Sequence, residues 1–352
     1  MTAQSSIDGA AGSTVIERAA GWPSSFKLAH RSKLLKSVAV SICLAILLFQ
    51  LGVLPSASQT VEDTGPLQQQ VEALFDPSHT LLDVKLAVDG MVDPSGNTEA
   101  INDMVDDMAA EITGMAGEGA ESAAKLASLK RYLYESGAWN GNRPFQYDLG
   151  DPLGIKPANR LLQRYLTTRR GNCITMPLLF VALGQRLGLR MTLSVAPLHV
   201  FVKYTDDTGK VWNLEPTSGG GFTRDEWYRQ KLPMSDRAVA NGVYLRALTH
   251  MESAVVIASF LVERYVDTGQ FEAALAVSDV LLQHYPNFAY GVVKQGSAYS
   301  GLLHRELAGK YTRMEDVPPD LKVKANQWYG RNIEAFARAE ALGWRPQDGQ
   351  IQ

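Results

Sequence analysis

The spacing of apolar residues divides the first part of the chain into helices. From Leu67 to about Gly137, apolar positions recur at steps of three and four residues, which is the period of an amphipathic helix. Turn-forming residues interrupt this pattern three times, and each interruption predicts the end of one helix and the start of the next. The interruptions lie at 76–78, 93–96 and 114–119.

A second helical region surrounds one cysteine. A short amphipathic helix is expected over Leu161–Leu166, and the break at Gly171-Asn172 follows it. After Cys173 the apolar positions describe a largely buried helix that ends at Gly188. Pro177 is compatible with that helix because it falls in the first turn, where its missing N–H has no intrahelical partner. The pattern therefore places Cys173 at a helix N-terminus.

From Met191 onward the period of the apolar residues becomes two, which predicts β-strands. After the preceding helices, this change predicts a segment of short strands. The expected strands are 192–196, 199–204 and 211–214.

The last two strands are joined by Asp206-Asp207-Thr208-Gly209, which has the composition of a hairpin turn. If the hairpin is centred near Asp207, His199 lies directly opposite Glu215, and Asn213 lies diagonally on the same face. A bulge at the turn glycine would shift this register.

The C-terminal third has the spacing of tetratricopeptide repeats. Tyr265 and Tyr299 are separated by 34 residues, which is the period of that repeat. A further helix is expected over Val323–Leu342, after an insertion that contains Pro318-Pro319. Generic helical hairpins are the alternative. Other residues at tetratricopeptide positions are Gly269, Phe271, Ala274, Pro286 and Gly296.

Two repeats are too few to be stable by themselves, so we expect them to dock on the preceding domain. The apolar side of Val255–Val262 would form this contact. The opposite face, near Tyr290, Lys294 and Tyr299, would then bind an extended peptide of a partner protein.

The N-terminal region predicts a membrane anchor. Residues Ser37–Leu54 carry no charge and just reach the length needed to cross a bilayer. Four basic residues precede this run, so the positive-inside rule leaves residues 1–36 in the cytoplasm and exports the rest. A cleaved signal peptide is the alternative, because small residues follow the run. The expected organisation is a disordered tail (1–36), an inner-membrane anchor (37–54), a linker (55–66), a periplasmic cysteine domain (67–249) and helical repeats (250–345).

Composition and charge exclude some classes of function. The chain has 352 residues, 45% of them hydrophobic and 20% charged, which is typical of a globular protein with about two domains. The net charge is -3, and it divides into +3 for residues 1–36 and -6 for the remainder. A nucleic-acid partner is therefore not expected. We also expect no metal or cofactor, because one Cys and one His without CxxC or HxxxH spacing supply too few ligands.

The candidate chemistry is that of a cysteine nucleophile. The other cysteine, Cys43, lies within the apolar run 37–54. Cys173 therefore has no disulfide partner among the residues that follow that run. His199 and then Glu215 follow it, and thiol, imidazole and carboxylate in this order suit nucleophilic catalysis. A helix N-terminus and a neighbouring imidazolium both favour the reactive thiolate. Each residue also has a purely structural interpretation, as a buried thiol, a strand histidine bonded to a backbone carbonyl and a surface ion-pair residue.

An oxyanion hole would complete this site. The backbone N–H of Cys173 is one candidate donor, and a side chain of the upstream loop, Asn142 or Gln146, is the other.

The motifs resemble those of the bacterial transglutaminase-like family that carries C-terminal tetratricopeptide repeats. They are Arg-Arg-Gly-Asn-Cys, Pro-Leu-His-Val-Phe-Val and Trp-Asn-Leu-Glu-Pro-Thr, and the resemblance covers most of residues 70–340. It implies a papain-like α+β core in which the helix that carries the cysteine packs on a small antiparallel sheet. In that core Cys173 is the nucleophile, His199 is the base, and Glu215 stands where transglutaminases usually have Asp. Because Glu is one methylene longer, Asn213 is the substitute for orienting the imidazole.

This resemblance implies acyl transfer from a peptide or side-chain amide. The acceptor is water in a protease or amidase, and an amine in a cross-linking enzyme. The competing class is a catalytically inactive scaffold in which the cleft and the repeats bind a partner protein. The sequence does not choose among these.

Overall fold

The computed structural model describes residues 64–346. No helix within that range is both long enough and apolar enough to span a bilayer. The expected membrane anchor, residues 37–54, lies outside the described residues together with the tail and most of the linker.

The first four helices within residues 64–346 begin and end where the turn-forming residues predict. Thr80 starts the second of them through a capping box, in which its backbone N–H donates to Asp83 (2.8 Å) and its hydroxyl accepts from the Asp83 N–H (3.2 Å). Asn97 caps the third by accepting from the Ala100 N–H (3.0 Å). The four helices are α3 (Gly65–Ala73), α4 (Leu81–Val92), α5 (Thr98–Ala116) and α6 (Ser122–Tyr134).

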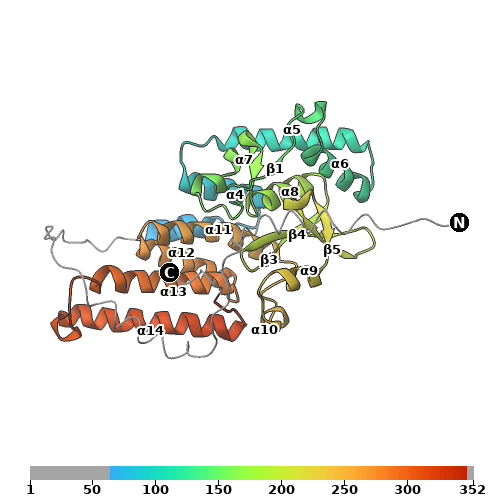
Figure 1. The fold of residues 1–352 in the computed structure, drawn as a ribbon. Helices are drawn as coiled ribbons and strands as arrows, with labels where there is room; N and C mark the ends of the chain where they lie inside the picture. The colour runs from blue at the N-terminus through green and yellow to red at the C-terminus, as the bar shows by residue number, and fades with distance from the viewer. Residues whose placement is uncertain (1–63, 347–352) are drawn as a thin grey trace.

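The middle of the chain combines two small sheets with the buried helix α8 (Figure 1). Strands β1 and β2 form a parallel pair, and β3 to β6 form an antiparallel sheet in chain order. The strands are β1 (Gln146–Tyr147), β2 (Arg170–Gly171), β3 (Arg190–Ala196), β4 (His199–Thr205), β5 (Val211–Glu215) and β6 (Gly221–Thr223). The helices are α7 (Leu162–Thr168), α8 (Thr175–Arg186), α9 (Asp225–Lys231) and α10 (Asp236–Ala240), with short 3-10 turns at 138–140, 157–160 and 216–218.

The β4–β5 hairpin has a register two residues away from the expected one. Val202 pairs with Leu214 and Thr205 with Val211, so His199 is not directly opposite Glu215. The connection between the strands, residues 206–210, is two residues longer than expected, and Gly209 within it adopts a left-handed conformation (φ 87°). Because side chains alternate with a period of two, this shift leaves His199 and Glu215 on the same face.

The C-terminal part consists of long helices that pack in sequence. Helix α11 contacts α12, α12 contacts α13, and α13 lies alongside α14 (Figure 1). The helices are α11 (His250–Asp267), α12 (Phe271–His284), α13 (Ala289–Leu307) and α14 (Pro319–Leu342), with a 3-10 turn at 314–316 before the last. This arrangement provides the expected helical hairpins, and their tetratricopeptide nature stays a prediction.

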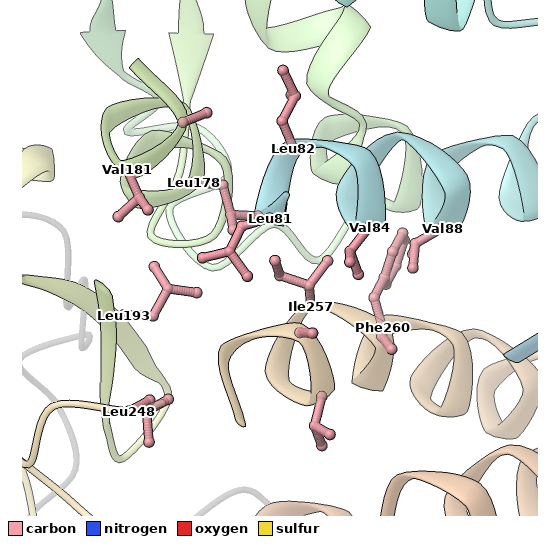
Figure 2. Packing of buried hydrophobic residues seen from close by; sticks show 14 of the residues in the cluster. Leu81, Leu82, Val84, Val88, Leu178, Val181, Leu193, Leu248, Ile257 and Phe260 are labelled. Carbon is pink, nitrogen blue, oxygen red and sulfur yellow. The ribbon is translucent and has the colours of Figure 1, made fainter. Parts of the chain in front are cut away.

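The C-terminal helices and the N-terminal part share one hydrophobic core. Figure 2 shows Leu81, Val84 and Val88 of α4 facing Ile257 and Phe260 of α11. All five side chains are buried and belong to one continuous cluster that also includes residues of α8 and β3. The expected docking surface of α11 is therefore part of the core.

This shared core predicts that the protein unfolds in a single transition. Leu81→Ala should destabilise the whole protein by about 3 kcal/mol, because it removes buried contacts on both sides of the boundary between α4 and α11.

Deleting residues 250–352 should lower the melting temperature of the remaining protein. Urea denaturation measures the effect of the Leu81→Ala substitution, and thermal denaturation measures the melting temperature of the truncated protein. Val323→Ala on the exposed side of α14 should change stability by less than about 0.5 kcal/mol. A truncated protein that melts at the full-length temperature would contradict shared folding.

Candidate cysteine site

Three elements bring the predicted site residues together. Cys173 lies two residues before the first residue of α8, His199 is the first residue of β4, and Glu215 is the last residue of β5. Helix α8 packs on β3 and β4, so the start of this helix meets one end of the sheet. The fold thus assembles thiol, imidazole and carboxylate from residues 42 positions apart or less.

The start of α8 is fixed by Asn172. Its side-chain oxygen accepts from the N–H groups of Ile174 (3.0 Å) and Thr175 (3.1 Å), which are free of intrahelical partners at a helix start. Its side-chain nitrogen donates to the carbonyl of Asn159 (2.8 Å). Since Asn172 is buried and held from both sides, the adjacent Cys173 has a defined position.

The Glu215 carboxylate is almost fully buried and binds the imidazole of His199. The Oε2 atom of Glu215 lies 2.7 Å from Nε2 of His199 and also accepts from the Tyr228 hydroxyl (2.9 Å). The Oε1 atom accepts from the hydroxyl (2.6 Å) and the N–H (3.2 Å) of Thr217. Four donors therefore hold the carboxylate, which is the condition for keeping a charge in the interior.

The site favours a protonated His199. Burial alone would lower the pKa of the imidazole, but the charge of Glu215 and the interactions with Cys173 outweigh it and raise the pKa to about 10. Burial opposes the charge of Glu215 too, and its pKa is nevertheless lowered by His199, Thr217 and Tyr228. At neutral pH the pair is therefore an imidazolium bound to a carboxylate.

The Cys173 side chain lies on the other side of the imidazole. It is 3% exposed, lines the same cavity as His199, and is one of the groups that raise the pKa of the imidazole. Since Nε2 of the ring binds Glu215, Nδ1 is the ring nitrogen that remains available to a thiol. The Sγ atom is also 3.8 Å from the carbonyl oxygen of Leu198.

The turn before His199 is strained. Leu198 has a positive φ of 56°, a conformation that is uncommon for a residue with a side chain. Its side chain is 45% exposed, so apolar packing does not explain the conformation. The turn instead joins β3 to β4 with only two residues and delivers His199 to the start of α8.

The donors expected for an oxyanion hole, the Cys173 N–H with Asn142 or Gln146, do not come together in the structure. The N–H of Cys173 donates to the carbonyl of Pro152 (3.2 Å), so it already has an acceptor. Asn142 and Gln146 are exposed, and neither lines the cavity that contains Cys173. Tyr147, which no sequence pattern indicated as a site residue, donates its hydroxyl to the same Pro152 carbonyl (3.3 Å). Burial and the charges of Cys173 and Glu215 raise its pKa, so the hydroxyl keeps its proton.

Asn213 does not bind the imidazole. Its side chain is buried and donates to Asp225 (2.7 Å), which also accepts from Lys203 (3.2 Å). The acceptor beside His199 is therefore Glu215. Thr217 and Tyr228, which hold Glu215, were not identified from the sequence as site residues, because Tyr228 comes from α9 and nothing in the pattern of that helix points to the sheet.

Cys173 and His199 line a cavity of about 320 Å³. Its wall is mostly apolar and is formed by the cysteine domain on one side and by α11 and α13 on the other. Tyr290 and Lys294, expected on a peptide-binding face of the repeats, lie in this wall, whereas Tyr299 does not. Within residues 64–346 no group of three or more His, Cys, Asp or Glu side chains could hold a metal ion.

The chain is similar to known proteins over this region. Residues 99–253 match the family model of the transglutaminase-like superfamily, so they form a transglutaminase-like domain. A UPF0162 protein of Xylella fastidiosa is 27% identical over 188 residues, which cover 51% of this chain and 63% of that relative. A UPF0162 protein of Buchnera aphidicola is 26% identical over 185 residues, covering 51% of this chain and 64% of the relative. The chain thus spans less than two thirds of these relatives, and no solved structure matches it.

Proposed function

Taking the transglutaminase-like domain as the premise, we propose that the protein is a cysteine enzyme that transfers acyl groups from amides through Cys173, His199 and Glu215. The observation that carries the proposal is the position of the imidazole, which binds a buried carboxylate with Nε2 and lines the same cavity as Cys173, a residue that helps to raise the pKa of the ring. A structural histidine needs neither a thiol partner nor a carboxylate held by four donors.

The geometry supports a two-step reaction. The Cys173 thiolate attacks the amide carbon and forms a C–S bond, and His199 gives its proton to the departing amine as the C–N bond breaks. The product is a thioester on Cys173. Water or an amine then attacks the thioester, the now neutral His199 accepts the proton, and the thiolate leaves. Glu215 holds the ring and stabilises its charged form throughout.

The oxyanion would form where two donors already converge. The N–H of Cys173 and the hydroxyl of Tyr147 both point to the carbonyl oxygen of Pro152. In our proposal a substrate oxygen replaces this carbonyl, so the segment around Pro152 moves when substrate binds. Two such donors are the usual number in an oxyanion hole.

The proposal is tested by trapping the thioester. Incubation with a small activated acyl ester should add one acyl group to Cys173, and mass spectrometry of the intact protein and its peptides detects it. Hydroxylamine should remove the group, because it cleaves thioesters. Cys173→Ala should gain no hydroxylamine-sensitive acyl group. Absence of acylation in the folded wild-type protein would reject the enzyme and leave the non-catalytic scaffold.

We further propose that residues 37–54 anchor the enzyme in the inner membrane with the domains exported to the periplasm. The basic residues before an uncharged run of 18 residues support this topology. A reporter that is active only in the periplasm, fused after residue 66, should be active, and the protein should resist extraction by carbonate. Activity of a cytoplasmic reporter at the same position would reverse the topology.

A further inference from the structure

The cavity beside Cys173 extends beyond what acyl transfer alone requires. It reaches from the cysteine and histidine to α13, where Tyr290 and Lys294 form part of its wall. Between them the wall is apolar, with side chains such as Val195, Ile257 and Phe260. A substrate that fills this space needs an apolar segment next to the amide that reacts.

The charged side chains of the wall are paired, with one exception. Lys85 forms an ion pair with Asp89 and donates to the carbonyl of Arg160 (2.8 Å). Arg160 in turn binds Glu263 (2.6 Å). These contacts leave neither cation available to a ligand without breaking a buried pair, which is costly.

Lys294 is the exception. Among the described residues it forms no ion pair with a carboxylate, and its Nζ lies 5.3 Å from the centroid of the Tyr290 ring. Glu263, the acidic residue of the wall, is already bound by Arg160. The helical wall of the cavity therefore carries one uncompensated positive charge on a half-buried side chain.

We propose that this cavity binds an apolar amide that carries a carboxylate, and that Lys294 pairs with this carboxylate while the amide lies at Cys173. This assignment rests on the proposed function for the role of Cys173, but binding itself does not require catalysis. It gives the C-terminal helices a role in selecting the substrate. An ammonium group at the edge of an apolar cavity favours a carboxylate because the pair is partly shielded from water.

The experiment measures binding to the full-length Cys173→Ala protein, which cannot form a thioester. The ligands are an N-acetylated apolar peptide with a free C-terminal carboxylate and the same peptide with a C-terminal amide. Isothermal titration should show that the carboxylate form binds about ten-fold more tightly, the factor expected for one charge-assisted hydrogen bond. The monoamide of a straight-chain dicarboxylic acid and the corresponding diamide form a second pair of ligands. If the preference for the carboxylate form is larger in the first pair, the natural ligand is a peptide; if it is larger in the second pair, the natural ligand is an acyl chain.

Additional substitutions assign the preference to Lys294. Lys294→Met should reduce the ratio of the two affinities, carboxylate form over amide form, to about one. Lys294→Arg keeps the charge and should retain this ratio. Lys324→Met on the exposed side of α14 is the matched control and should leave the ratio unchanged. Equal binding of both forms, no binding of either pair, or a preference that survives Lys294→Met would overturn the proposal. Binding with the expected preference in a protein that never acylates Cys173 would instead reject only the acyl-transfer function.

Discussion

Replacing His199 with alanine should slow alkylation of Cys173 by iodoacetamide by roughly 30-fold at pH 7. The imidazole keeps its proton up to about pH 10 and lies against the sulfur, so it favours the thiolate across the neutral range. Without it the cysteine resembles an ordinary thiol, of which only about 3% is ionised at pH 7. Alkylation rates measured between pH 5 and pH 10, with the modified peptide identified by mass spectrometry, test this expectation.

The pH profile provides the sharper readout. In the wild-type protein the rate should already be high below pH 8, and in His199→Ala it should rise only above that pH. His304→Ala removes an exposed histidine of α13 and should leave the profile unchanged. If wild-type Cys173 titrates like a free cysteine, the ion pair proposed for catalysis does not exist.

Glu215→Gln should destabilise the protein by about 3 kcal/mol at pH 6. The substitution removes the negative charge beside a buried imidazolium, and breaking a buried pair typically costs this much. Glu215→Asp keeps the charge but withdraws it by one methylene, so it should recover part of the loss. Urea denaturation measures the difference, and Glu118→Gln in an exposed loop should alter stability by less than about 0.5 kcal/mol.

The penalty of Glu215→Gln should depend on pH in both directions. The lowered pKa of Glu215 stabilises the folded state above pH 4.5, the ordinary pKa of a glutamate. This contribution is lost as the pH falls through the lower pKa that Glu215 has in the folded protein. The raised pKa of His199 stabilises the folded state fully below pH 6.5, the ordinary pKa of an imidazole. This contribution is lost as the pH rises through about 10. The penalty should therefore be largest between about pH 4.5 and 6.5, and a constant penalty from pH 4 to pH 10 would show that the effect is steric.

Much of this protein follows from local sequence alone. Helices α3 to α6 and α8 lie where the apolar period predicts, because their turn residues and caps act within a few positions along the chain. The change to a period of two located β3, β4 and β5 for the same reason. Cys173, His199 and Glu215 could be proposed together because their residue types and order already limit the possible chemistry.

The tertiary structure decided what depends on contacts between distant segments. The connection over residues 206–210 set the hairpin register, and only the packed sheet showed that Glu215, and not Asn213, binds His199. Tyr228 reaches Glu215 from α9, and Pro152 takes the N–H of Cys173. The cavity joins Lys294 to Cys173 across 121 positions of sequence. Sequence patterns report which face of an element is buried, whereas the partner on that face is determined by how the elements pack.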